Sequence, residues 1–218
     1  MAEPMTRREF VTVAGVTLGA AALLGTVPGC AAPTGSADAE IETPSSTYGG
    51  GPKVEKRVLV GYATRTGATV GVAEAIGKTL GERGFAVDVK PLKERPSLSG
   101  YDAVVLGSAI NGGAWLPEAV SFVDANASAL DKVPVAAFCV HMMNLEDTEK
   151  HRAKRLAYLD SVRALITPSD EGFFAGVSPM SEDTALIARW AFKAFGGGGE
   201  GDCRDWDAIR AWAEQARI

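Results

Sequence analysis

The chain has 218 residues, enough for one domain of ordinary size plus a terminal extension. Its 22 Lys and Arg residues stand against 27 Asp and Glu residues, a formal net charge of −5, so no basic face indicates a nucleic-acid partner. Three cysteines are too few for a disulfide scaffold, and His141 and His151 lack the partner spacing of a metal site.

Residues 1–30 carry the features of an export signal. Residues 6–11, Thr-Arg-Arg-Glu-Phe-Val, resemble the twin-arginine motif, and an uncharged apolar run follows to Val27. The end of this run resembles a lipoprotein cleavage box, which would make Cys30 the lipidated first residue, although Pro28 departs from the pattern. A buried helix, a membrane span or an uncleaved anchor are the alternatives. We expect the folded part to lie on the extracytoplasmic side of the membrane, attached through its N-terminal anchor.

Residues 31–53 are rich in Ala, Pro, Thr, Ser and Gly and end in Gly-Gly-Gly-Pro followed by Lys53. Such a segment buries too little apolar surface to offset the entropy lost when it is ordered. We therefore expect a flexible tether over 31–53 and the folded domain over residues 54–218.

The domain begins with a strand, a hydroxyl-rich loop and a helix. An apolar run rich in branched residues over 58–63 predicts a buried parallel strand, and apolar residues at a helical spacing follow from Val72. The loop between them lies where a helix N-terminus offers unpaired N–H groups and a positive dipole end, which favours a bound phosphate. An ordinary strand-to-helix turn capped by threonine is the alternative.

This loop resembles the flavodoxin phosphate loop, T-x-T-G-x-T, which Thr64, Thr66, Gly67 and Thr69 match position for position. The resemblance implies that the loop holds the 5′-phosphate of FMN. Arg65 is a departure from the family, and its cation either pairs with the phosphate or points to water. The candidate cofactor-binding residues of this loop are Thr64, Arg65, Thr66, Gly67, Ala68 and Thr69.

The rest of the domain alternates strands and helices. Alternating apolar and polar residues over 85–90 predict an edge strand. Further strands are expected at 103–107, 133–140 and 172–177, and helices at 117–126, 149–166 and 205–216. This order predicts an α/β protein, a flavodoxin-like three-layer sandwich with a five-stranded parallel sheet of order 2-1-3-4-5. Its ligand crevice is expected at the carboxyl ends of the first and third strands.

Two more loops are expected to contact the flavin ring. The loop after the third strand contributes Ser108, Ala109, Ile110, Asn111, Gly112, Gly113 and Trp115. Trp115 either stacks on the ring or packs under the following helix. The loop after the fourth strand begins at His141 and lacks the tyrosine of flavodoxins, so His141 either bonds to the flavin or serves as a cap or an exposed residue.

The C-terminal third resembles the menaquinone-dependent protoporphyrinogen oxidase group of flavodoxin-like proteins. The resemblance rests on residues 173–176, Arg189, Trp190, Lys193, the glycine run 196–199, 201–202 and 204–206. It implies non-covalent FMN and oxidation of a porphyrinogen with electrons passed to quinone. Residues 182–195 predict an added helix, whose Trp190 and Phe195 cover the sheet as core in the favoured interpretation, or dock a quinone, a porphyrin or the membrane.

Three functions follow from these patterns. The leading hypothesis is an exported, membrane-tethered FMN protein that transfers electrons to a redox partner protein or quinone. No nucleophile or acid/base pair is visible, and electron transfer requires none, so we assign no catalytic side chain. The alternatives are an enzyme of the menaquinone-dependent protoporphyrinogen IX oxidase type and a binding module that has kept the fold without the flavin.

Overall fold

The computed structural model describes residues 41–51, 56–178, 186–194 and 197–218, all from one compact unit. The expected signal at 1–30, with Cys30, lies outside the described residues. Within them, no helix has the length and apolar character needed to cross a membrane.

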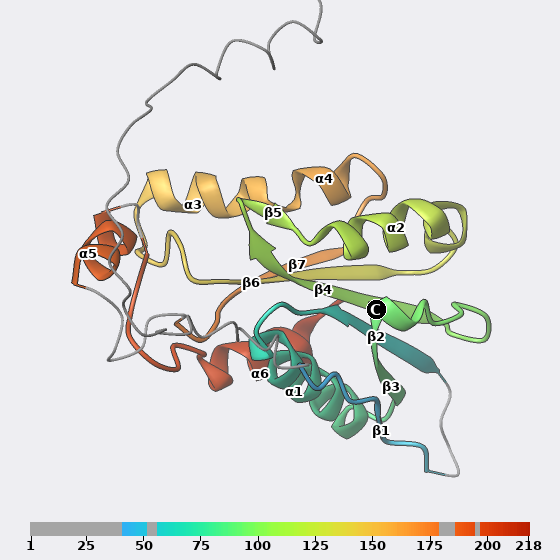
Figure 1. Cartoon of the computed structure of the whole chain (residues 1–218). Helices are drawn as coiled ribbons and strands as arrows, with labels where there is room; N and C mark the ends of the chain where they lie inside the picture. The colour runs from blue at the N-terminus through green and yellow to red at the C-terminus, as the bar shows by residue number, and fades with distance from the viewer. Residues whose placement is uncertain (1–40, 52–55, 179–185, 195–196) are drawn as a thin grey trace, which may run out of the picture. The chain divides into compact units, whose positions relative to one another are not determined.

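A parallel sheet forms the middle layer (Figure 1). Five parallel strands lie in the order β3, β2, β4, β6, β7, which is the predicted order 2-1-3-4-5. Two short strands extend it: β1 pairs antiparallel with β3, and β5 pairs antiparallel with β4. The strands are β1 (Ser46–Tyr48), β2 (Arg57–Ala63), β3 (Ala86–Pro91), β4 (Ala103–Asn111), β5 (Ala114–Trp115), β6 (Val135–His141) and β7 (Asp170–Ala175). The flavodoxin-like fold is confirmed, and the sheet is corrected from five parallel strands to a mixed sheet of seven.

The edge strand β1 comes from the segment that was expected to be a flexible tether. Ser46 pairs with Val89 and Tyr48 with Val87. The hydroxyl groups of Ser46 and Tyr48 both donate to the carboxylate of Glu74 on helix α1 (Ala68–Glu82), the serine bond being 2.7 Å long. Burial and this carboxylate raise the pKa of Tyr48 to about 12, so its hydroxyl stays a donor. Residues 46–48, which were expected to belong to the tether, are therefore part of the sheet. Composition did not reveal this because their pairing partners lie about forty residues further along the chain.

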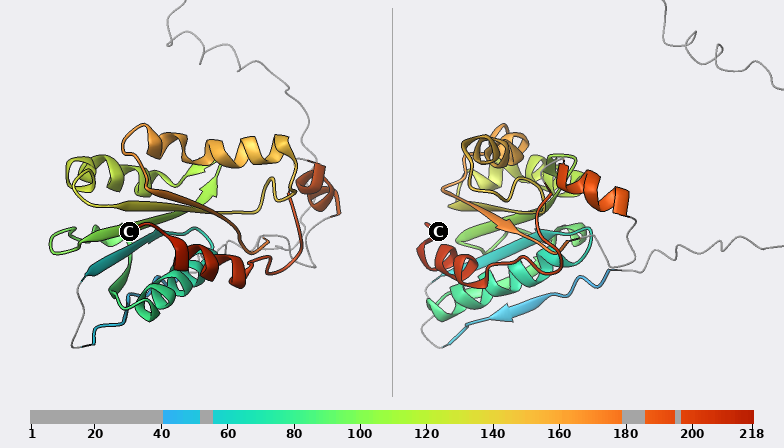
Figure 2. Two further views of the ribbon diagram at one scale, coloured as in Figure 1. Left: turned by 180° about the vertical axis from the view of Figure 1, so that it is seen from behind. Right: turned by 90° about the vertical axis from the view of Figure 1, so that its left-hand side faces the viewer.

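Helices cover both faces of the sheet (Figures 1 and 2). The helix pair α1 and α6 packs on one face, and α2, α3 and α4 lie on the other. The helices are α1 (Ala68–Glu82), α2 (Pro117–Leu130), α3 (Glu149–Leu156), α4 (Asp160–Arg163), α5 (Leu186–Ala194) and α6 (Trp206–Gln215), with 3₁₀ turns at Leu92–Glu94 and Ala157–Leu159. The single helix predicted over 149–166 is thus divided into α3, a 3₁₀ turn and α4.

The core consists of two apolar layers, one on each face of the sheet. Successive residues of β2 point to opposite faces, so Leu59 packs toward α2 and Val60 toward α1. Gly107 in β4 leaves room for the ring of Phe138, since a Cβ atom there would lie 1.9 Å from the Phe138 Cζ atom. Both layers reach the strand ends, so the loops that follow the strands start from fixed positions.

Helix α5 lies beyond the carboxyl ends of the strands rather than over the sheet (Figure 2). The favoured sequence interpretation put Trp190 in the core, and this prediction is wrong, because its side chain is 74% exposed. Phe195, its expected companion, lies outside the described residues. The apolar periodicity of this segment correctly predicted a helix. Periodicity alone does not say whether the apolar face of a helix packs against the core.

Candidate functional site

The loop between β2 and α1 turns at a single glycine. Gly67 is the N-cap of α1 and has φ 85°, a left-handed conformation that glycine adopts without steric cost. The Thr64 Oγ1 atom accepts a hydrogen bond of 3.0 Å from the Gly67 N–H and so holds the turn. Thr66 is exposed at the loop tip, whereas Thr69 is fully buried in the first turn of α1.

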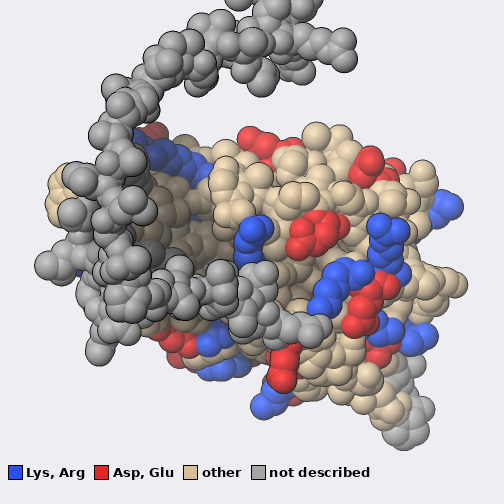
Figure 3. All heavy atoms as spheres, viewed as in Figure 1, with Lys and Arg blue, Asp and Glu red and all other residues tan. Residues whose placement is uncertain are grey.

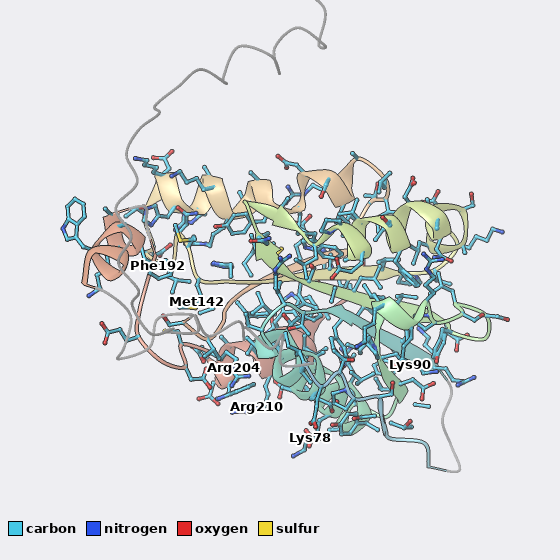
Figure 4. All side chains as sticks on the ribbon, viewed as in Figure 1. Lys78, Lys90, Met142, Phe192, Arg204 and Arg210 are labelled. Carbon is cyan, nitrogen blue, oxygen red and sulfur yellow. The ribbon has the colours of Figure 1, made fainter. Side chains whose placement is uncertain are left out.

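A cavity of about 540 Å³ opens at the carboxyl edge of the sheet, where the loops after β2, β4, β6 and β7 meet α5. Met142 after β6 and Phe192 on α5 bring two of these elements to one wall (Figure 4). Most of the lining is apolar, and its polar side chains come mainly from the loop after β2, from the end of β4 and from the loop after β6. The lining residues are Arg65, Thr66, Ala68, Thr69, Ala109, Ile110, Asn111, Gly112, Gly113, Val140, His141, Met142, Met143, Asn144, Tyr158, Gly176, Val177 and Phe192.

His141 ends β6 and points its ring into this cavity with a fixed tautomer. Its Nδ1 atom lies 2.8 Å from the carbonyl oxygen of Met143, and because a carbonyl only accepts, Nδ1 carries the proton. The Nε2 atom is then an acceptor, and it is buried without a partner among the described residues. Burial, opposed by the hydrogen bond to the Met143 carbonyl and reinforced by the Arg155 cation, lowers the pKa of His141 to about 4. The side chain is therefore neutral at pH 7.

Asn144 supplies a second acceptor beside His141. Its backbone has φ 61°, a conformation that asparagine tolerates better than most residues. Its Nδ2 group donates to the Tyr158 hydroxyl at 2.7 Å, and that hydroxyl donates to the Met143 carbonyl at 3.2 Å. Arg155 fixes the loop by donating to the Asn144 carbonyl at 2.5 Å. The Asn144 Oδ1 atom is left buried with no partner in the described part of the chain.

Four of the predicted site residues do not line the cavity. Thr64 and Gly67 hold the turn of the loop between β2 and α1 through their hydrogen bond. Ser108 is buried, accepts from the Leu116 N–H at 3.0 Å and donates to the Ala109 carbonyl at 2.8 Å. Trp115 is 3% exposed and its Nε1 atom lies 3.2 Å from the Cys139 sulfur, so it packs in the core, which is the second of the two alternatives for this residue.

The other ten predicted residues do line the cavity, together with eight that the sequence reasoning missed. Met142, Met143 and Asn144 stood next to His141, so the loop position was a signal for them even without a family motif. Tyr158 and Phe192 come from helices, and no local pattern connects them to the strand ends. Only the folded chain brings them to this wall.

Three residues that line this cavity carry a buried polar atom without a partner in the described residues: Thr69 Oγ1, His141 Nε2 and Asn144 Oδ1. A buried polar atom without a hydrogen bond costs roughly 1–3 kcal/mol, so a site that collects three is suited to a ligand that pairs with them. The threonine lies at the N-terminal end of α1, which favours an anion. The two acceptors at the other loop suit N–H donors on a ring, and the apolar lining between them suits its faces.

The fold and this cavity define a doubly wound α/β protein with a candidate ligand site at the point where the strand order reverses. The sequence model of the family described as Flavodoxin domain matches residues 59–181, and the chain belongs to this family.

Two sets of known proteins are similar to the chain. The protoporphyrinogen IX dehydrogenases [quinone] of Escherichia coli strain K12 and O157:H7 are each 30% identical over 89 residues, 40% of this chain and 49% of each relative. The chain spans about half the length of these curated relatives. An archaeal flavodoxin structure is 17% identical with a TM-score of 0.45, covering 73% of this chain and 94% of its own. Oxidised flavodoxin 1 from Bacillus cereus is 19% identical with a TM-score of 0.42, covering 63% and 95%.

Proposed function

We propose that the chain is an exported, membrane-tethered FMN protein that transfers electrons. The observation that carries the proposal is that one cavity is lined by the threonine loop and by His141 and Asn144, and that Thr69, His141 and Asn144 each hold a buried polar atom without a partner among the described residues. FMN has a phosphate at one end, which suits the threonine loop, and a ring with N–H and carbonyl groups at the other, which suits the acceptors of His141 and Asn144. When bound, its isoalloxazine ring supplies one- and two-electron chemistry.

Each end of the cavity has a distinct task. At the phosphate end, Thr66 and Thr69 donate their hydroxyl hydrogens, and the first N–H groups of α1 add donors in a favourable field. Arg65 supplies a cation that lines the same end. At the ring end, the neutral His141 accepts a hydrogen bond at Nε2 from a ring N–H group. Thr64 positions the loop without touching the phosphate.

Purification of the full chain tests the cofactor. We expect a yellow protein that releases FMN on heating, with an affinity for FMN well above that for riboflavin. A colourless protein that does not take up added FMN would contradict the proposal and favour the flavin-less binding module.

The twin-arginine motif and the apolar run after it support export and a tether. Replacing Arg7 and Arg8 by lysine is expected to leave the protein in the cytoplasm, and Cys30→Ser is expected to abolish lipidation. Cell fractionation and metabolic labelling with a fatty acid measure these two effects. Export of the Arg7 and Arg8 double variant at the wild-type level would rule out the twin-arginine route.

A second candidate function is oxidation of a porphyrinogen with quinone as the electron acceptor. The specific observation in its favour is the 30% identity over 89 residues to protoporphyrinogen IX dehydrogenases [quinone]. Assaying the purified holoprotein with protoporphyrinogen IX and a menaquinone separates the candidates. Turnover with both substrates supports the enzyme, whereas flavin reduction and reoxidation by quinone without porphyrinogen turnover supports the electron carrier.

A further inference from the structure

The described chain enters the fold at the edge where the cavity opens. A Cβ atom on Gly67 would lie 3.8 Å from the Ile41 side chain, so the chain passes beside the phosphate loop. The Tyr62 hydroxyl then donates to the Pro44 carbonyl at 2.7 Å. Because β1 runs antiparallel to β3, its first residue lies near the carboxyl end of β3. The N-terminal segment is therefore attached to the domain at the carboxyl edge of the sheet.

The length between the proposed lipid anchor and this entry point is short. Ten residues, 31–40, separate Cys30 from Ile41. A flexible chain of that length has a root-mean-square span of about 16–19 Å and reaches at most about 35 Å when fully extended. A domain of this size is roughly 40 Å across. Such a tether holds the carboxyl edge near the anchor and is too short to let the opposite edge face it freely.

An exposed aromatic residue lies at the same edge. Trp190 on α5 is 74% exposed, and only Leu156 joins it as an exposed large apolar residue in the described ranges. Phe192 on the same helix lines the cavity, and the Gly198 N–H joins the segment after α5 to the Met142 carbonyl at 3.0 Å. Tryptophan suits the boundary between water and lipid, because its ring is apolar and its N–H remains hydrogen-bonded. Exposed Lys193 stands one turn further along α5.

We propose that the carboxyl edge, with the cavity mouth and Trp190, lies against the lipid bilayer that holds the N-terminal anchor. This inference rests on the proposed membrane tether. It gives the cavity a direction: the bound ring faces a lipid phase rather than open water, which suits a lipid-soluble electron partner. The C-terminus lies at the other edge, where Arg217 pairs with Asp170 at the start of β7.

Quenching of tryptophan fluorescence by lipids with brominated acyl chains tests the orientation. The full chain, purified with its anchor, is reconstituted into vesicles of phosphatidylethanolamine and phosphatidylglycerol with or without bromine. We expect bromine to quench part of the emission, and we expect this part to be lost in Trp190→Phe. Because Trp190 is exposed, the variant should keep the melting temperature of the wild type.

A reporter at the other exposed apolar position is the matched control. In the Trp190→Phe background, Leu156→Trp adds a tryptophan at the end of α3, and we expect no bromine quenching there. Vesicle-bound protein whose bromine quenching is the same in wild type and Trp190→Phe would overturn the orientation while leaving the tether intact. Protein that does not float with the vesicles at all would overturn both the tether and this inference.

Discussion

Replacing Thr69 by valine separates two effects of one hydroxyl group. In the protein without ligand, Oγ1 is buried and unpaired among the described residues, so its removal should leave the stability unchanged or raise it by about 1–3 kcal/mol. With FMN bound, the same hydroxyl donates to a phosphate, and such a charge-assisted hydrogen bond is worth roughly 1.5–3 kcal/mol. The FMN affinity should therefore fall by about 10- to 150-fold, while riboflavin affinity stays the same.

Both quantities are measurable on the same samples, by urea unfolding of the flavin-free protein and by titration of flavin fluorescence. Thr79→Val on α1 is the matched control, because Thr79 is also buried but its hydroxyl donates to the Ala75 carbonyl at 2.9 Å. We expect that variant to lose about 1 kcal/mol of stability and to keep its FMN affinity. A Thr69→Val protein that is less stable and binds FMN normally would refute the assignment of this hydroxyl to the phosphate.

Three further predictions concern the ring end, the core and the sheet edge. In the unfolded chain His141 has its ordinary pKa of about 6.5, whereas the buried ring, facing Arg155 and Tyr158, stays neutral down to about pH 4. As the pH falls between these values, the flavin-free protein should lose up to about 3 kcal/mol of stability. Urea unfolding of His141→Gln should show a shallower decline of stability with falling pH. Trp115→Phe should lower the melting temperature, because the ring is buried against Cys139, without shifting the visible flavin spectrum; a spectral shift would mean that the ring contacts the flavin. Glu74→Ala should speed amide hydrogen exchange across β1 and β3, because Ser46 and Tyr48 lose their hydrogen-bond acceptor. The control Glu82→Ala, at an exposed position of the same helix, should not change the exchange. Equal exchange in both variants would show that β1 is held by other contacts.

The sequence was most informative where chemistry and position coincide along the chain. Three features depend on neighbours only a few residues away, and the sequence therefore predicted them. They are the loop from Thr64 to Thr69, the alternation of strands and helices, and the glycines after β4. The predicted strand order followed from the alternation of strands and helices and from the edge pattern of the second strand, which together fit the flavodoxin-like order. These features were enough to locate the cavity at the ends of β2 and β4.

The features that the sequence missed depend on partners far along the chain. Tyr48 belongs to the sheet because its backbone pairs with Val87 and its hydroxyl donates to Glu74. Composition alone, without these partners, predicted a tether for its segment. For Trp115 the sequence favoured stacking on the flavin ring and packing in the core equally, and its contact with Cys139 decides for the core. The tautomer of His141 depends on one carbonyl two residues away, whose direction follows from how Asn144 turns the loop.

The antiparallel strand β1 has a consequence for the order in which the chain folds. Residues 46–48 are synthesised before β2, yet their hydrogen-bonding partners lie in β3, about forty residues later. During synthesis β1 therefore has no strand to join until β3 has been made and has paired with β2. Residues 46–48 can therefore join the sheet only after their partner strand β3 has been synthesised. A chain that ends before residue 86 would lack the strand partner of β1, so the docking of β1 requires that the first strand–helix–strand unit has been synthesised.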